Sequence, residues 1–255
     1  MGSKFIKLLV VLVLVAYLVF LIVARTPATW GAWALHRAAP DVWLAGVSGT
    51  LWEGRASSGV AMVGDQALPL ENLRWQLKPW SLLSLRLCAD VDADLLGQPA
   101  SGVFCGAPGD RVIARQVQLN APMAVVAEVV NVPLSGQVSL QLQMLKAKGQ
   151  YVEELEGNLS WRDARWHNGE SWVPVGAFAA KLSPNEQGGI AAQIFDLDGP
   201  FTVDLTASLV LNQEPRVHGT VAAAPEAPEQ ITSALEFVGV PQEDGSFRVA
   251  WPPGT

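Results

Sequence analysis

The first forty residues and the rest of the chain differ in their pattern of hydrophobic positions. Between Lys7 and Arg25 the chain has 17 residues without a charge, almost all of them apolar. As an α-helix, residues 8–24 would extend about 26 Å, close to the roughly 30 Å of hydrocarbon in a bilayer. The pattern therefore predicts one membrane-spanning helix over residues 8–24.

The hydrophobic region of a cleaved signal peptide is the alternative interpretation of this run. Such regions are about 7 to 15 residues long and end at a small-x-small cleavage site. This run is longer, and Arg25, Thr26 and Pro27 follow it. We therefore interpret it as an uncleaved anchor, with residues 1–7 as a short tail and residues 25–40 as a membrane-proximal linker.

After residue 40, apolar positions alternate with polar ones, as in strands with one buried face. In the clearest case, residues 201–211, Phe201 and Val203 begin an apolar series, whereas Thr202 and Asp204 begin the polar series between them. Segments with the same period occur at 73–77, 138–144, 159–161, 217–221 and 247–251, and residues typical of turns separate them. This pattern predicts an antiparallel, curved β-meander with one apolar face over residues 41–255.

Only two segments after residue 40 have helical spacing. Residues 228–239 begin with Pro, place Ile231 and Leu235 on one side and stop at Gly239. A shorter segment follows Pro122. The expected fold class is mainly β: a single N-terminal transmembrane helix, then an antiparallel β-rich domain with one or two short helices.

Charge sets the expected orientation of the anchor. Residues 1–40 contain four basic residues and no acidic residue, so the formal net charge of −7 leaves −11 for the rest of the chain. A short tail with Lys4 and Lys7 would cross a membrane reluctantly, which keeps the N-terminus in the cytoplasm. In a bacterium, residues 41–255 would then lie in the periplasm. The acidic balance also argues against a nucleic-acid partner.

Four residues flank the expected anchor at the membrane interfaces. Lys7 and Arg25 bound the run, and Trp30 and Trp33 follow it, where an indole can bury its ring at the headgroup level. The other eight of the ten tryptophans are spread over residues 41–255. For these eight we expect packing in the core rather than a binding surface.

Cys88 and Cys105 are the two cysteines of the chain, and 16 residues separate them. Because the periplasm is oxidising, these thiols can form a disulfide, which would stabilise the fold by about 3 kcal/mol. The alternative is two unrelated buried thiols. A metal site is not expected, because no nearby His completes a tetrahedral set of ligands.

Catalytic signatures are not found in the sequence. His36, His167 and His218 are far apart and have no metal-ligand spacing. Residues 46–49 are one residue short of a G-x-S-x-G nucleophile elbow, and the acids at 90–94 lack the Gly and Glu of a calcium loop. Phosphate-binding glycine loops are also missing. We therefore expect no catalytic residue, no cofactor, no metal and no small-molecule substrate.

A series of short motifs gives a more specific indication. The segment WLAGVSGTLWEG, at 43–54, follows the single anchor, and LRWQLKPW follows at 73–80. Further short motifs continue in order along nearly the whole chain. With these motifs the chain resembles protein N of the type II, or general, secretion pathway. The motif positions are Gly46, Gly49, Leu51, Trp52, Gly54, Trp75, Pro79, Gly157, Trp161, Asp198, Gly199 and Gly239.

The resemblance implies a single-pass accessory component of the bacterial inner membrane. Such a component would support export of folded periplasmic proteins across the outer membrane, without enzyme activity. Its expected partners are other secretion components, either inner-membrane platform proteins or the outer-membrane secretin. The alternative is an AsmA-like envelope protein that handles lipid or another hydrophobic ligand in an apolar β-groove. A continuous uncovered apolar face would favour that alternative, and a 228–239 helix packed into the groove would count against it.

Overall fold

The structure, a computed structural model, describes residues 2–63, 66–125, 127, 132–210, 212–224, 227, 235 and 239–252. The chain divides into two compact units, residues 1–97 and residues 98–255, called here the first and the second unit. Antiparallel strands make up most of the second unit and form the sheet of the first, which confirms the mainly β fold class.

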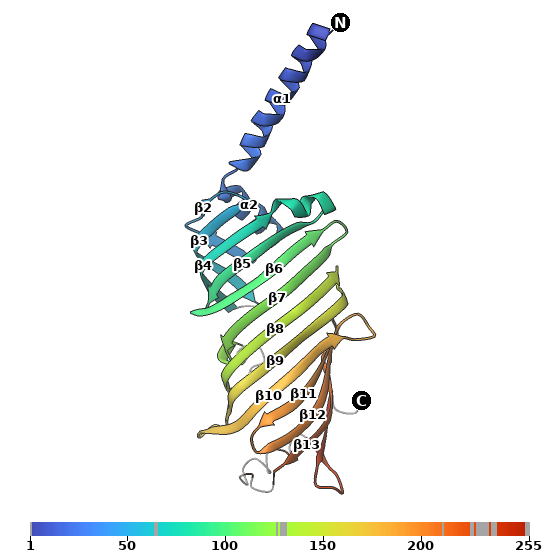
Figure 1. The fold of residues 1–255 in the computed structure, drawn as a ribbon. Helices are drawn as coiled ribbons and strands as arrows, with labels where there is room; N and C mark the ends of the chain where they lie inside the picture. The colour runs from blue at the N-terminus through green and yellow to red at the C-terminus, as the bar shows by residue number, and fades with distance from the viewer. Residues whose placement is uncertain are drawn as a thin grey trace. The chain divides into compact units, whose positions relative to one another are not determined.

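The first unit contains two α-helices, one 3₁₀ helix and five strands among its described residues (Figure 1). They are α1 (Gly2–Ala24), α2 (Ala28–Ala38), β1 (Val42–Ala45), β2 (Ser48–Gly49), β3 (Glu53–Val63), β4 (Gln66–Lys78), η1 (Pro79–Ser84) and β5 (Leu87–Leu95). The hairpin of β3 and β4 is central: β1 and β2 pair with β3, and β5 pairs with β4. On β4 the apolar Leu73, Trp75 and Leu77 are half-buried, whereas the polar residues between them are exposed. The predicted alternation over 73–77 is confirmed.

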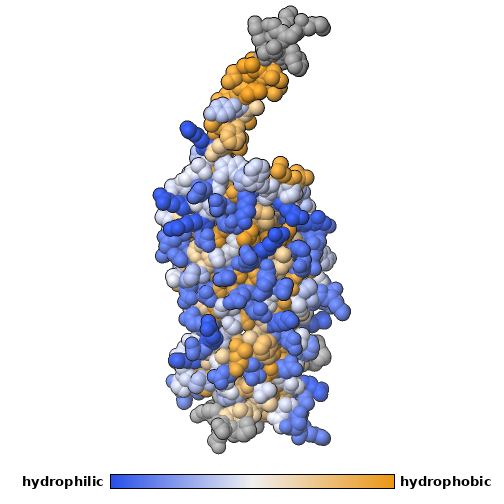
Figure 2. All heavy atoms as spheres, in the orientation of Figure 1, coloured by the Kyte–Doolittle hydropathy of each residue, from blue (hydrophilic) through white to orange (hydrophobic). Residues whose placement is uncertain are grey.

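Helix α1 covers the segment that was predicted to cross a membrane. Its side chains are described from Leu9 onward, and nearly all of them are apolar and exposed around the whole helix. Figure 2 shows this part of the helix as mainly hydrophobic. No helix within the described residues combines the length and the apolar character that a membrane crossing requires.

Most of the segment 25–40, which was expected to be a linker, forms the helix α2. Pro27 occupies the N-cap with an extended backbone, and the helix starts at the next residue. Proline is tolerated there because the first N–H groups of a helix have no partner within it. His36 and Arg37 lie in the last turn, where positive charge is favourable to the helix dipole.

The second unit is a meander of ten strands in its described residues. They are β6 (Gln98–Ala107), β7 (Arg111–Pro122), β8 (Leu134–Lys148), β9 (Tyr151–His167), β10 (Trp172–Pro184), β11 (Ile190–Asp198), β12 (Phe201–Leu209), β13 (Arg216–Ala223), β14 (Val240–Pro241) and β15 (Phe247–Trp251). From β6 to β13 each strand pairs antiparallel with the next, and β15 then pairs with both β13 and β14. The sheet is curved and open, as Figure 1 shows for this unit, in agreement with the prediction.

One face of the second unit is apolar along the strand order. A row of directly paired residues crosses from β7 to β12 and consists of Leu119, Leu140, Leu159, Ala180, Ile194 and Leu205. The predicted strand 201–211 is confirmed over 201–209 as β12, in which Val203 and Ala207 are buried and Thr202 and Asp204 are exposed; residue 211 lies outside the described residues. The face turned to the viewer in Figure 2 carries mainly hydrophilic side chains over these strands.

Both predicted helices of the second unit fall largely outside the described residues. Of the 228–239 segment, Leu235 is helical and buried, and its carbonyl accepts a 2.9 Å hydrogen bond from the N–H of Gly239. After Pro122 a helical turn begins, in which the Ala127 N–H donates to the carbonyl of Met123 at 2.9 Å. The start of this second helix is therefore confirmed.

Four of the tryptophans that were expected in the core are exposed instead. They are Trp43, Trp80, Trp172 and Trp251. Two of them pack on a neighbouring imidazole: Trp43 on His36, with ring centroids 4.1 Å apart, and Trp172 on His167, at 5.0 Å. Such ring contacts stabilise an aromatic residue at the surface without burying it. The core prediction was wrong for these four.

Candidate functional site

The first motif, WLAGVSGTLWEG, folds into a tight double turn at one end of the β3–β4 hairpin. Gly46 and Gly49 adopt φ angles of 64° and 95°, a backbone region that favours glycine. A Cβ on Gly49 would lie 2.6 Å from the carbonyl oxygen of Glu53. These glycines let β2 fold back against the start of β3, with Ser48 opposite Arg55.

This turn holds the C-terminal end of α1. The indole N–H of Trp52 donates to the backbone carbonyl of Val23 at 2.8 Å, and the Leu51 N–H donates to the carbonyl of Thr26 at 2.8 Å. Thr50 also forms an isolated antiparallel bridge with Pro27. The Val23 carbonyl, at the end of α1, also accepts a 3.3 Å hydrogen bond from the Thr26 N–H, so the Trp52 indole supplies a second bond to it. We call this contact between the 50–52 turn and the end of α1 the junction.

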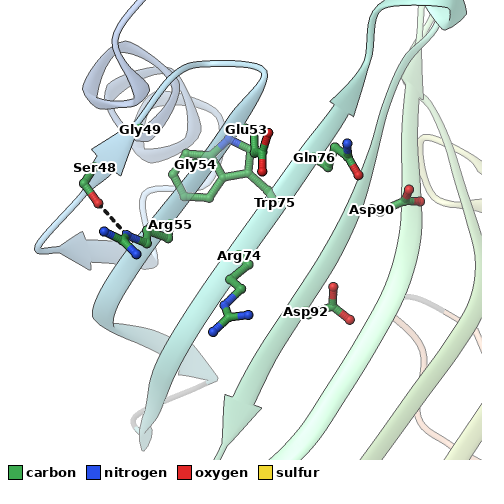
Figure 3. Close-up of a pocket in the computed structure, with 10 residues that line it drawn as sticks. All are labelled: Ser48, Gly49, Glu53, Gly54, Arg55, Arg74, Trp75, Gln76, Asp90 and Asp92. Atoms are coloured by element: carbon green, nitrogen blue, oxygen red, sulfur yellow. Dashed lines mark hydrogen bonds between the residues drawn. The ribbon is translucent and has the colours of Figure 1, made fainter.

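Trp75, on the neighbouring strand β4, holds the 50–52 turn of the junction in place. Its indole N–H donates to the carbonyl of Leu51 at 3.1 Å, and its ring lies against Gly54 (Figure 3). A Cβ on Gly54 would collide with that ring, so glycine is needed for this close approach. The N–H of Leu77 donates to the Trp52 carbonyl at 2.7 Å. Five of the predicted motif positions thus act together in one structural unit: Gly49, Leu51, Trp52, Gly54 and Trp75.

The second unit contains a similar arrangement of tryptophan and glycine. The Trp161 indole N–H donates to the carbonyl of Ser135 at 3.1 Å, and a Cβ on Gly136 would lie 2.7 Å from its Nε1. The Trp161 ring also packs on Phe178, with centroids 5.6 Å apart. In both units an indole crosses to the neighbouring strand, covers a glycine and bonds a nearby carbonyl.

The sequence contains a signal for this likeness that the motif analysis missed. The pattern Asn-Leu-x-Trp-x4-Trp occurs twice, at 72–80 and at 158–166. Its first Trp is Trp75 in one unit and Trp161 in the other. The repeat is therefore visible in the sequence once the two strands are compared, whereas the glycine partners become apparent only in the structure.

The remaining motif positions lie in the second unit or after β4. A Cβ on Gly157 would come within 2.9 Å of the Gln141 carbonyl, and a Cβ on Gly199 within 2.7 Å of the Cα of Gly176. Asp198 ends β11, and Pro79 begins η1. These positions shape close backbone approaches and turns, and they do not converge on one chemical site.

A polar surface of mixed charge lies on the outer side of β3, β4 and β5 (Figure 3). Ser48, Arg55, Arg74 and Asp92 are paired in one row across four strands, and Glu53, Gln76 and Asp90 form the next row. The Arg55 Nε–H donates to the Ser48 hydroxyl at 3.0 Å. Lys78 forms an ion pair with Asp90 at 2.7 Å. We call these two rows the charged rows.

The other predicted site residues are placed as follows. Cys88 lies in β5 and Cys105 in β6; both side chains are buried, and neither is a free thiol. Trp30 and Trp33 are exposed on α2, and Arg25 directly follows α1. Lys7 belongs to the part of α1 whose side chains are not described. The pairing of the cysteines and the interfacial role of the other four stay predictions.

Within the described residues, no group of three or more His, Cys, Asp or Glu side chains is arranged to hold a metal ion. The acidic residues of β5 instead bind neighbouring side chains: Asp90 pairs with Lys78, and Asp94 accepts a 2.7 Å hydrogen bond from Asn72. The charged rows line a pocket of about 570 Å³ that is open to the surroundings (Figure 3). Such a surface is suited to contact with another macromolecule.

Comparison with known proteins gives one consistent result. The family described as type II secretion system protein N matches residues 40–250. Type II secretion system protein N of Aeromonas hydrophila is 32% identical over 96% of this chain and 96% of its own length. The protein of the same name from Vibrio cholerae serotype O1 is 27% identical over 80% of this chain and 81% of its own length. No solved structure matches the chain. The chain belongs to the type II secretion system protein N family.

Proposed function

We propose that this protein is an accessory inner-membrane component of the type II secretion system. In this role it supports export of folded periplasmic proteins across the outer membrane through protein–protein contacts, without enzyme activity. α1 serves as a single-pass anchor with a cytoplasmic N-terminus, and both units lie in the periplasm.

The junction is the observation that carries the anchoring role. The described part of α1 is apolar in every direction, a composition typical of helices surrounded by lipid. Soluble proteins rarely expose an apolar patch of more than a few hundred Å². The bonds from Trp52 to Val23 and from Leu51 to Thr26 connect this helix directly to the sheet. An anchor that is joined to the sheet in this way would hold the first unit close to the membrane.

The charged rows are the surface that we assign to partner contact. Arg55 and Arg74 stand directly opposite each other on neighbouring strands, and like charges in this position are unfavourable to the sheet. Asp92 extends the row on β5. An unfavourable pair at an exposed position is consistent with selection for binding. The partner would be an inner-membrane platform protein or the outer-membrane secretin.

Deletion of the gene tests the secretion role. A folded exoprotein is followed in medium and periplasm, and outer-membrane lipid leakage is recorded in the same cultures. We expect the exoprotein to accumulate in the periplasm while the envelope stays intact, and the wild-type gene to restore secretion. Normal secretion with a leaky envelope would contradict the proposal and would favour lipid handling.

A charge reversal tests the assigned contact surface. Arg74→Glu should weaken recovery of secretion components with the membrane-embedded protein and should reduce secretion. The same change creates an opposite-charge pair with Arg55 and a like-charge pair with Asp92, so the two effects offset each other and stability should change by less than about 1 kcal/mol. Arg216→Glu, at an exposed position on β13, is the matched control. Equal secretion and recovery for both variants would show that the charged rows are not the contact.

A reporter fused after Thr255 tests the topology. Alkaline phosphatase folds only in the periplasm and should be active in this fusion, whereas a reporter that works only in the cytoplasm should be inactive. The opposite pair of results would contradict the proposed orientation.

The lipid-groove alternative has weaker support. The apolar face of the second unit is covered at its C-terminal end by Leu235, which packs with Val203, Val221, Phe247 and Val249. Leu235 belongs to the segment whose packing into the groove was expected to count against a carrier. The deletion experiment above separates the two functions.

A further inference from the structure

The most exposed apolar side chains of the first unit outside α1 lie on and just after η1. Trp80 has an exposed fraction of 81%, Leu83 of 82% and Leu85 of 75%. In Figure 2 a hydrophobic group projects near the end of α1, at the place that η1 takes in Figure 1. A soluble surface would normally not present three such large apolar side chains within six residues.

Hydrogen bonds hold this segment in a defined shape. The Ser81 hydroxyl donates to the Lys78 carbonyl at 2.6 Å, and the Ser84 hydroxyl donates to the Ser81 carbonyl at 2.8 Å. Leu85 adopts φ 53°, a left-handed conformation that is uncommon for a bulky residue. The segment is therefore an ordered projection, and the strained Leu85 backbone is kept although its side chain contacts little protein.

Two consecutive hydrogen bonds place the segment at the membrane end of the first unit. The Trp52 indole bonds the Val23 carbonyl of α1, and the Trp52 carbonyl accepts from the N–H of Leu77. Trp80 follows Leu77 by three residues, a reach of about 10 Å at most. The helix α2, which carries the exposed Trp30 and Trp33, begins four residues after the end of α1.

The side chains around the projection suit a lipid headgroup region. Trp and Leu are the residues that bury at the boundary between headgroups and acyl chains, and indoles prefer this level. Arg86 lies directly after the 79–85 segment and Arg25 follows α1, whereas the charge of Lys78, directly before the segment, is paired with Asp90. Basic residues beside an apolar projection attract anionic headgroups. A buried protein interface would instead be depleted in such charges at its centre.

We propose that residues 79–85 insert into the outer leaflet of the membrane that α1 crosses, as a second, interfacial attachment. This inference rests on the proposed anchor, and it adds that the first unit lies against the lipid surface rather than on a free stalk. The helix and the projection would then fix the tilt of the first unit relative to the bilayer. With α1 as its single attachment, the first unit could still rotate about the axis of that helix.

Photocrosslinking to lipid tests the insertion. Trp80, Leu83, Trp43 and Leu14 are replaced one at a time by benzoylphenylalanine in the full chain, which is reconstituted into phosphatidylethanolamine–phosphatidylglycerol vesicles with a tagged phospholipid. Trp43 is 61% exposed, but it pairs with Val60, which is seven residues along β3 from Glu53 and so about 23 Å from the residue that follows the junction. Position 43 is therefore the matched control, an exposed side chain that we expect to face water and not lipid. Leu14 reports on the anchor itself.

We expect lipid adducts at 14, 80 and 83, each several-fold above the level at 43. Labelling at 14 with no excess at 80 and 83 over 43 would overturn the insertion and leave the anchor standing. No labelling at 14 would overturn the anchor of the proposed function, and the insertion with it. Adducts between two protein copies at 80, without lipid, would also overturn the insertion.

A second variant tests the role of the leucines. Leu83→Ser combined with Leu85→Asn removes the apolar side chains, while Asn tolerates the left-handed backbone at position 85. The fold should keep its melting temperature, and lipid adducts at position 80 should fall several-fold. Unchanged adducts in this double variant would count against the insertion.

Discussion

The indole N–H of Trp52 and the backbone carbonyl of Val23 are joined by a 2.8 Å hydrogen bond across 29 residues of sequence. This bond connects the sheet of the first unit to the last turn of α1. A tryptophan that reads in the sequence as one more apolar side chain thus acts through its nitrogen. Its role is to join two elements.

Trp52→Phe should loosen the junction while it keeps an aromatic ring in place. Loss of one hydrogen bond costs about 0.5–1.5 kcal/mol. Hydrogen exchange at the Leu51 amide, which bonds Thr26, should become faster. Trp43→Phe removes an equally large exposed indole elsewhere and should leave that amide unchanged. Similar exchange in the two variants would contradict the junction.

Gly54→Ala should destabilise the first unit, because the new Cβ would collide with the Trp75 ring. Forcing extra volume into a packed contact costs about 1–3 kcal/mol. We expect a lower melting temperature and a changed near-ultraviolet dichroism from Trp75. Gly106→Ala is the matched control, since nothing lies within 4 Å of a Cβ there. Equal stability of both variants would show that Trp75 moves aside freely.

Cys88 and Cys105 should be joined to each other in protein taken from an oxidising compartment. The denatured chain should then contain no thiol that reacts with maleimide until a reductant is added. Cys88→Ser should release one reactive thiol, at Cys105. Replacing both by Ser should cost about 3 kcal/mol of stability in the chain-entropy model. Two reactive thiols in the unreduced wild-type chain would disprove the pairing.

The turn before β15 contains a carboxylate with a lowered pKa. The Ser246 hydroxyl and backbone N–H donate to Asp244 at 2.6 Å and 2.9 Å, and these bonds hold the pKa of Asp244 below its ordinary 3.8. The stabilisation is present above about pH 4 and is lost as pH falls through the lowered pKa. Ser246→Ala should raise the pKa toward 3.8 in a carboxyl NMR titration. An unchanged titration curve would contradict this cause.

Local pattern was enough to predict some of these elements and not others. The alternation of Phe201, Val203 and Leu205 identifies β12, because successive side chains of a strand point to opposite faces of the sheet. The contact of Gly54 with Trp75 depends on strand pairing between residues 21 positions apart, which periodicity does not encode. α2 was missed because its Ala and Trp residues suit both a helix and an interfacial linker.

The tryptophans show why burial was harder to predict than strand position. Trp161 packs on Phe178 as expected of a core residue, whereas Trp80 projects from η1 and contacts little of the protein. Residue type is the same for both. Their burial differs because Trp80 lies in η1, which begins at Pro79, whereas Trp161 lies within the strand β9. The repeat of Asn-Leu-x-Trp was available in the sequence, and comparison of the two halves would have found it.

The uninterrupted antiparallel order of β6 to β13 has a consequence for how the second unit acquires its structure. Each strand pairs with the one just before it, so every new pairing closes only a short loop and loses little chain entropy. The sheet can therefore grow one hairpin at a time, from the N-terminal side, in the order in which a chain is delivered across a membrane. Among the described strands of this unit, β14 and β15 depart from this order, because β15 pairs with β13 before β14 is added at the edge.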